Sequence, residues 1–172
     1  QLKSDGLPPG YSTQVALVRS DDGSLASPVS LTAPLSDAQI LEMVYRVLDL
    51  EGGLQGRLSA GARVVIKPNV VEPANLENGV NTDPRVVEGL IRWITAHGPG
   101  NLSITVAEAA GGWLAPEMRD TKYNSGSAPI ADGFAQAGYR DMQARLAADG
   151  IAITLLDANF GSYTEPLKNI RL

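Results

Sequence analysis

The sequence predicts an α/β fold, a three-layer sandwich around a mostly parallel sheet of about four to five strands. Short apolar runs rich in β-branched residues alternate with longer segments whose apolar residues recur at helical spacing, and this repeated βαβ pattern favours a parallel sheet. One run, Ala62–Lys67, is almost continuously apolar, as is typical of a strand covered on both faces. Residues that commonly cap helices stand before two of the longer segments, which indicates where those helices begin.

The first strand is expected at Thr13–Arg19, after a flexible lead-in over residues 1–12 that is rich in Gly and Pro. A polar loop then leads to Ser36 and Gln39, whose spacing is that of a capping box. Apolar residues at helical spacing follow. This helix is expected to end near Glu51, before two consecutive glycines.

The middle of the chain is expected to supply a buried strand and a second helix. Ala62–Lys67 is the strand, and Pro68 terminates it because proline cannot donate a ladder hydrogen bond. Asp83 precedes Pro84, which would occupy the preferred first position of the helix. The apolar stripe of this helix continues to His97, where a glycine follows.

Two further strands and a third helix complete the predicted fold. Leu102–Ala107 is the third strand, and the Gly-rich stretch over residues 108–129 follows it; loops of this length often carry function. A helix is expected over about Ile130–Ala148 and a fourth strand at Ile151–Leu156. Tyr163–Leu167 is a candidate for a short extra strand.

Composition narrows the classes of function. The 172 residues carry a net charge of −5 and a pI of about 4.8, which argues against non-specific nucleic-acid binding and a polybasic membrane surface. No apolar run approaches the roughly 18 residues of a membrane span. The chain has no cysteine and one histidine, His97, so it offers no disulfide, no thiol nucleophile and no metal site built from several histidines or thiolates. We assign it no metal ligands.

Polar residues gather where the predicted strands end and the next helix begins. Right-handed crossovers bring the carboxyl ends of parallel strands to one rim, where open α/β sheets bind ligands. Lys67 supplies a point charge for a phosphate or carboxylate, and Asn69 offers a donor and an acceptor. The helix start at Thr82 and Asp83 adds backbone N–H groups. We therefore assign Lys67 and Glu108 as catalytic candidates, and Asn69, Thr82 and Asp83 as ligand-binding candidates.

Each of these residues also has a structural reading. Asp83 suits a plain N-cap, since capping alone accounts for Asp-Pro at this position. Lys67 at a strand end is often only solvated. Glu108 either caps a helix or lines a cleft, as an acid or base. Glu108 and Asp157 would alternatively hold a hard cation such as magnesium, although Asp157 also suits a structural role at the end of its strand.

Five short runs resemble the DUF362 family, a bacterial and archaeal domain of unknown function. They occur in the order and spacing expected of that family: Val64–Asn69, Asn81–Val87, Val106–Glu108, Ala137–Arg140 and Leu155–Asp157. The resemblance covers roughly residues 13–172, and its specificity rests on the first two runs. We expect residues 13–172 to form a single α/β domain, either complete or a fragment of a longer family domain.

The resemblance predicts possible partners of the domain but does not identify a reaction. Many family members carry iron–sulfur-binding segments, and some are exported by a twin-arginine signal. Family domains usually continue past the point where this sequence stops, which implies a missing C-terminal half or a protein partner. The motif positions Lys67, Asn69, Thr82 and Asp83 carry over without established catalytic roles. The compartment is expected to be the cytoplasm, the periplasm or the exterior, and the cofactor is unknown.

Two functions follow from these observations. The first is a soluble domain that binds a small anionic ligand at the rim of the sheet, with any catalysis linked to iron–sulfur redox partners. The second is a structural or interaction subunit that packs against other chains without catalysis. The first requires Lys67 and Glu108 to lie at the same end of the sheet, whereas an exposed apolar patch would favour the second.

Overall fold

The computed structural model describes residues 15–54, 56–70, 79–108 and 133–157. Its centre is a parallel sheet of three described strands in the order β1-β2-β3. These strands are β1 (Arg63–Ile66), β2 (Ser103–Glu108) and β3 (Ile153–Asp157). All three therefore run in one direction, and their carboxyl ends lie at one edge of the sheet. The predicted α/β class and parallel sheet are confirmed.

The apolar face of the sheet packs against helices. In the register of the sheet, Val64 pairs with Ile104, and Val106 pairs with Ile66 on one side and Leu155 on the other. The central-strand residues Ile104 and Val106 are buried, at 6% and 0% exposure. Side chains that alternate with them point to the opposite face, because successive residues of a strand face opposite ways.

Two capped helices have the expected bounds. Helix α1 (Asp37–Leu50) begins after Ser36, and the Ser36–Gln39 pair forms the predicted capping box. Helix α2 (Pro84–His97) begins after Asp83, whose carboxylate accepts the backbone N–H of Arg85. Both starts satisfy N–H groups that a helix leaves without internal partners.

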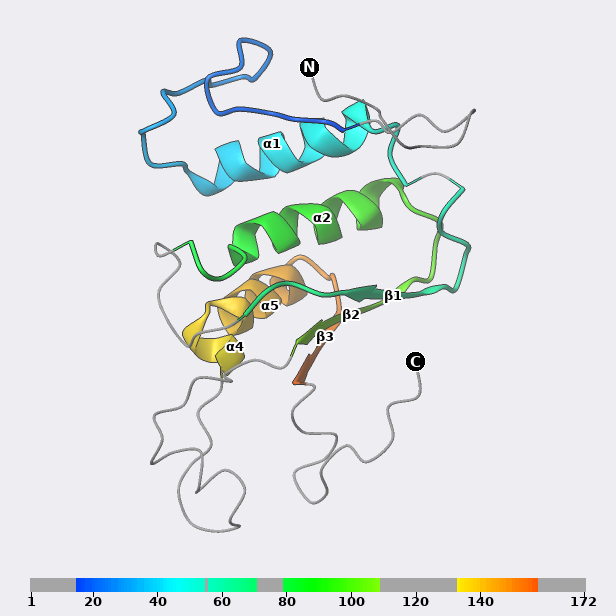
Figure 1. Ribbon diagram of the computed structural model, residues 1–172. Coiled ribbons are helices and arrows are strands. Elements are labelled where there is room, and N and C mark those ends of the chain that lie inside the picture. The colour runs from blue at the N-terminus through cyan, green and yellow to red at the C-terminus, as the bar shows by residue number, and fades with distance from the viewer. Residues whose placement is uncertain (1–14, 55, 71–78, 109–132, 158–172) are drawn as a thin grey trace, which may run out of the picture.

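Helix α1 packs on α2 rather than on the sheet, so α2 lies between α1 and the strands (Figure 1). The two helices approach closely at Gly89, where an added Cβ atom would lie 3.0 Å from Val44 Cβ. The described part of the chain therefore stacks α1, α2 and the sheet in that order. The three-layer sandwich, with helices on both faces of the sheet, stays a prediction.

The expected helix over residues 130–148 is divided in two. Helix α4 (Gly133–Gln136) is a single turn, and α5 (Tyr139–Ala148) follows it. Gly138 separates them with a φ of 80°, a left-handed conformation that glycine adopts without strain. Phe134, Met142 and Leu146 are buried and form the inner face of this segment.

The first predicted strand is wrong over its described residues, since residues 15–19 belong to no strand. The segment instead runs alongside α1, on the side away from α2 (Figure 1). Ala16 donates its N–H to Glu51 Oε1 at 2.6 Å, while Val18 is buried. Exposure alternates with burial along the segment, but no strand pairs with it among the described residues. Residues 1–12 and Tyr163–Leu167 lie outside the described residues.

No described helix is long and apolar enough to cross a membrane.

Candidate functional site

Three polar residues mark the carboxyl edge of the sheet. Lys67 directly follows β1, Glu108 is the last residue of β2, and Asp157 is the last residue of β3. Glu108 and Asp157 are partners in the β2–β3 register. Their backbones are therefore adjacent across the two strands, as the rule for parallel strands predicts. We call this edge the rim.

Lys67 and Glu108 form an ion pair on the rim. Lys67 Nζ lies 2.6 Å from Glu108 Oε2, and the Lys67 side chain is 69% exposed whereas that of Glu108 is 14% exposed. Oε2 itself is fully buried and has no hydrogen bond to the described residues. The contact is thus an ion pair by distance that lacks the angles of a hydrogen bond. Lys67 Nζ also reaches the carbonyl oxygen of Pro68 at 3.3 Å, at the long end of hydrogen-bond distances.

Asn69 and Thr82 are joined by two hydrogen bonds. The N–H of Asn69 donates to Thr82 Oγ1 at 3.0 Å, and the N–H of Thr82 donates to the carbonyl oxygen of Asn69 at 2.8 Å. Asn69 Nδ2 also donates to the carbonyl oxygen of Val80 at 2.7 Å. These bonds fix the start of α2 against the end of β1. The Asn69 amide keeps a second N–H, and the Thr82 hydroxyl keeps its proton.

The carboxylate of Asp83 makes hydrogen bonds that stabilise the start of α2. Its carboxylate caps α2 through the N–H of Arg85, and it also accepts from the guanidinium of Arg85, with the closest contact at 2.6 Å. Hydrogen bonding to Asp83 raises the pKa of Arg85. Arg85 reaches on to Leu35 and Asp37, which lie at the start of α1. The predicted capping role of Asp83 is therefore confirmed, and its role as a ligand contact stays a prediction.

Tyr139 is a rim residue that the sequence analysis did not assign. Its side chain is fully buried, and its hydroxyl donates to the carbonyl oxygen of Thr82 at 2.8 Å. Burial, followed by the negative charges of Asp83 and Glu108, raises the pKa of Tyr139. The first residue of α5 therefore supports the same loop that Asn69 supports. Its sequence signal was only that Ala137–Arg140 is one of the family-like runs.

Among residues 15–54, 56–70, 79–108 and 133–157, no group of three or more His, Cys, Asp or Glu side chains is placed to hold a metal ion. His97 belongs to the opposite end of the domain, since it is the last residue of α2 whereas the rim adjoins the first. The structure thus brings Lys67 and Glu108 together and joins Asn69 to Thr82. The chemical roles assigned to these four residues stay predictions.

The model of a known family matches this chain. The family is described as a domain of unknown function, DUF362, and the match covers residues 64–169, more than half of the chain. No curated protein and no solved structure matches the chain. The matched region includes the rim residues Lys67, Glu108 and Asp157, together with Tyr139. The chain therefore belongs to the DUF362 family.

Proposed function

We propose that this domain binds a small anionic ligand, a phosphate or a carboxylate, at the rim. The observation that carries the proposal is the ion pair between Lys67 and Glu108, in which the ammonium group is exposed and the carboxylate is nearly buried. An exposed ammonium at the carboxyl edge of a parallel sheet is well placed to meet a ligand. Lys67 is also the one lysine among the described residues.

Neighbouring groups supply hydrogen bonds for such an anion. The second amide N–H of Asn69 and the hydroxyl proton of Thr82 are not used in the bonds that join the two residues. Both donors belong to the loop ends that follow β1 and precede α2. Tyr139 fixes this loop through the carbonyl oxygen of Thr82. Asp83 contributes by holding the helix start and not by direct contact with the anion, because its carboxylate is bonded to Arg85.

Glu108 is the candidate acid or base of this site. An anion that binds Lys67 competes with Glu108 for the ammonium group, and Glu108 then loses its counter-charge in a largely buried position. Glu108 is therefore placed beside an anion bound at Lys67, where a carboxyl group serves as an acid or a base. The 172 residues contain no cysteine, so they supply no thiolate ligand for an iron–sulfur cluster.

Titration calorimetry with inorganic pyrophosphate and with a nucleotide tests the proposal. We expect Lys67→Ala to weaken binding by about tenfold or more, which corresponds to at least about 1.4 kcal/mol. Arg57→Ala is the matched control because it removes an exposed positive charge from the segment before β1, toward the other end of the strand. Equal affinity in Lys67→Ala and the parent would remove Lys67 from the site, and a parent that binds no anion would contradict the proposal.

A second variant addresses Glu108. We expect Glu108→Gln to bind pyrophosphate at least as tightly as the parent, because the neutral amide no longer competes with the anion for the ammonium group of Lys67. Weaker binding by Glu108→Gln would contradict this competition.

A structural or interaction subunit is the second candidate function, and a different observation favours it. Val64 and Ile66 of β1 pack against the core beneath the helices, whereas Val65, between them, is 66% exposed. Leu156 of β3 is exposed on the same face as Val65, at 42%. The described helices leave this face of the sheet uncovered, and apolar residues gathered there suit contact with another chain.

Light scattering coupled to size-exclusion chromatography separates the two candidates. An interaction subunit would self-associate or bind a partner through this face, and Val65→Lys would abolish the association while Lys67→Ala would leave it intact. A monodisperse monomer that binds pyrophosphate would favour the anion-binding function instead.

A further inference from the structure

A hollow lies at the other end of the domain from the rim. It is a cavity of about 200 Å³ between the end of α2 and the segment that precedes β1. Its described lining residues are mostly apolar and include no Asp, Glu, Lys or Arg: Leu54, Gly56, Leu58, Trp93, His97, Gly98 and Pro99. The length of α2, roughly 20 Å at 1.5 Å per residue, separates this cavity from the rim.

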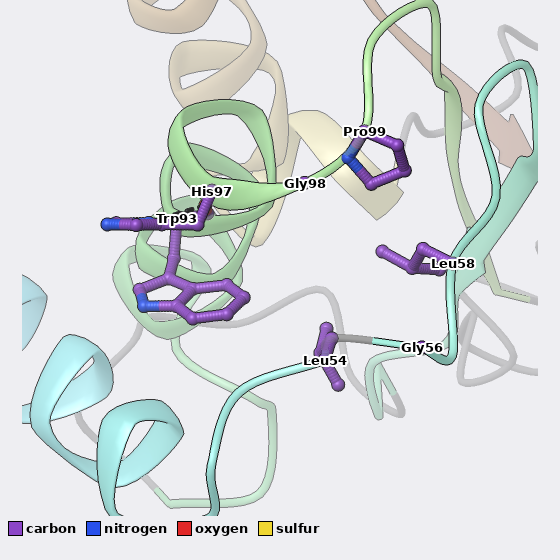
Figure 2. A pocket seen from close by; sticks show the side chains of 7 residues that line it. All are labelled: Leu54, Gly56, Leu58, Trp93, His97, Gly98 and Pro99. Atoms are coloured by element: carbon purple, nitrogen blue, oxygen red, sulfur yellow. Dashed lines mark hydrogen bonds between the residues drawn. The ribbon is translucent and has the colours of Figure 1, made fainter.

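The indole of Trp93 forms a wall of the cavity. Its Nε1–H donates to Asp49 Oδ1 at 3.1 Å, which ties the polar edge of the ring to α1. The six-membered ring of the indole consequently points the other way, toward Leu54 and Leu58 (Figure 2). The side chain is 4% exposed. The cavity is thus bordered by the apolar edge of an aromatic ring whose polar edge already has a partner.

His97 holds that ring in place from the side. The two rings stack with their centroids 4.8 Å apart and their planes at 28°. His97 Nδ1 lies 3.0 Å from the carbonyl oxygen of Trp93, so Nδ1 carries the proton and donates it. The ring of Tyr45 contacts the imidazole edge-on, with the two ring centroids 6.3 Å apart. These contacts hold the Trp93 wall in one orientation before any ligand enters, which lowers the entropy cost of binding.

Two segments of the chain, one before β1 and one after α2, border the cavity. Leu54 and Leu58 pack against the core from the segment before β1, and Pro99 faces them from the segment after α2 (Figure 2). Gly98 admits no side chain, because an added Cβ atom would collide with the carbonyl oxygen of Ile94 and would lie 3.2 Å from Leu102 Cδ1. The chain therefore turns from α2 toward β2 at a position where only glycine fits.

We propose that this cavity binds a small neutral apolar ligand about the size of one aromatic ring. An apolar cavity of about 150 Å³ in another protein stays dry and binds benzene, and this one is larger. The described lining has no carboxylate, ammonium or guanidinium group for a polar ligand. An aromatic ring would instead pack edge-to-face or offset against Trp93 and bury its surface on Leu54 and Leu58. This site is independent of the anion-binding rim.

Titration with toluene tests the proposal through the fluorescence of Trp93. The chain has two tryptophans, so a Trp113→Phe background leaves Trp93 as the reporter. We expect a saturable change in its emission and a thermal midpoint that rises with toluene concentration, because a ligand of the folded state stabilises it. Absence of a saturable change in the folded protein would overturn the proposal.

Cavity-filling variants locate the binding. Leu58→Phe and Leu54→Phe each add volume inside the cavity, and we expect either to weaken toluene binding by about tenfold. Leu17→Phe makes the same substitution at a side chain that is 76% exposed and should bind as the parent does. Far-UV circular dichroism verifies that each variant is folded, and either filled variant suffices if the other does not fold. Unchanged toluene affinity in a folded filled variant would place the ligand elsewhere.

The rim provides the cross-check. Lys67→Ala should bind toluene as the parent does, and Leu58→Phe should bind pyrophosphate as the parent does. If the parent bound toluene but not pyrophosphate, only the anion-binding proposal for the rim would be contradicted. If it bound pyrophosphate but not toluene, only the proposal for the cavity would be contradicted.

Discussion

Lys67 Nζ lies 2.6 Å from Glu108 Oε2, although the two residues differ sharply in their exposure to solvent. The lysine follows β1 and the glutamate ends β2, so adjacent parallel strands place one charge in water and the other largely out of it. Removal of one partner of this ion pair is therefore expected to affect stability differently from removal of the other. Loss of the lysine leaves a buried carboxylate without a counter-charge, whereas loss of the carboxylate leaves an ammonium that water hydrates.

The first prediction is that Lys67→Ala destabilises the fold more than Glu108→Gln does. Because Lys67 is mostly exposed, the pair is screened, and we expect only about 1 kcal/mol for the lysine variant and about half of that for the glutamine variant. Urea denaturation of both variants and the parent measures the difference. A larger loss in Glu108→Gln would show that the carboxylate, and not its counter-charge, stabilises the rim.

The second prediction concerns a buried carboxylate between two helices. Glu88 of α2 is 5% exposed, and its oxygens accept from Arg92 at 2.9 Å and from Arg145 of α5 at 2.7 Å. Arg92 also contacts Asp149 at 2.7 Å. We expect Glu88→Ala to cost about 3 kcal/mol in the free energy of unfolding, because it removes the buried carboxylate that joins Arg145 to Arg92 and, among the described residues, leaves only Arg92 with a carboxylate partner, Asp149.

Glu88→Gln keeps the shape of the side chain and an acceptor oxygen, so it should cost less than Glu88→Ala. Glu42→Gln is the control, because Glu42 accepts a backbone N–H from Ala26 in an exposed contact. Chemical denaturation ranks the three variants. A Glu88→Ala protein as stable as Glu42→Gln would mean that the ion pairs between α2 and α5 contribute little to the fold.

The helices and their starts were predictable because the signals are local. Ser36 with Gln39, and Asp83 with Pro84, satisfy backbone donors within a few residues, and both helices begin where these residues predict. The segment at residues 15–19 shows that a local sequence pattern does not identify the element on which a segment packs. Its apolar residues indicate that part of the segment is buried, and Val18 is buried, but an apolar run does not specify whether its partner is a strand or a helix. Here it lies along α1.

The candidate site was predictable to the extent that it follows from strand direction. Parallel strands must end at one edge, so Lys67 and Glu108 were expected at the same end, and they form an ion pair there. Tyr139 was not predictable in this way. Its hydroxyl bonds a backbone carbonyl of Thr82, 57 positions away in the sequence, and a backbone acceptor leaves no residue-specific signal. The cavity beside Trp93 likewise arises from packing between distant segments.

The third prediction is that Gly98→Ala destabilises the end of α2. Gly98 has an extended backbone with a φ of −78° and a ψ of 169°, so an alanine would suffer no backbone strain. Its Cβ atom would instead collide with the carbonyl oxygen of Ile94. We expect a loss of about 1–3 kcal/mol, as for other overpacked positions. Gly100→Ala is the control because an added Cβ atom there meets nothing within 4 Å.

Thermal unfolding of the two alanine variants measures this difference. Gly100→Ala should unfold close to the parent, and Gly98→Ala should unfold several degrees lower, since 1 kcal/mol shifts the midpoint of a domain of this size by roughly 2–4 °C. Equal midpoints would mean that the end of α2 moves to accommodate the methyl group. The cavity beside Trp93 would then change shape, and the toluene affinity of Gly98→Ala would differ from that of the parent.

The fourth prediction is a loss of stability at alkaline pH that depends on Tyr139. Burial raises the pKa of this hydroxyl in the folded state above the value of about 10 in an unfolded chain. Above that pH the unfolded chain releases the proton while the folded state retains it, so the unfolded state is favoured increasingly as pH rises. The contribution of Tyr139 is present in full below about pH 10 and decreases by up to about 1.4 kcal/mol per pH unit above it, until the folded-state hydroxyl also ionises.

Tyr139→Phe isolates this contribution from the other groups that titrate at alkaline pH. At neutral pH we expect the variant to be less stable than the parent by about 1–2 kcal/mol, because the carbonyl oxygen of Thr82 loses its buried donor. The difference should shrink as pH rises above about 10, since phenylalanine cannot ionise in either state. Urea denaturation of the variant and the parent between pH 7 and pH 11 measures this difference, and a difference that stays constant with pH would mean that the hydroxyl of Tyr139 titrates alike in the folded and unfolded chains.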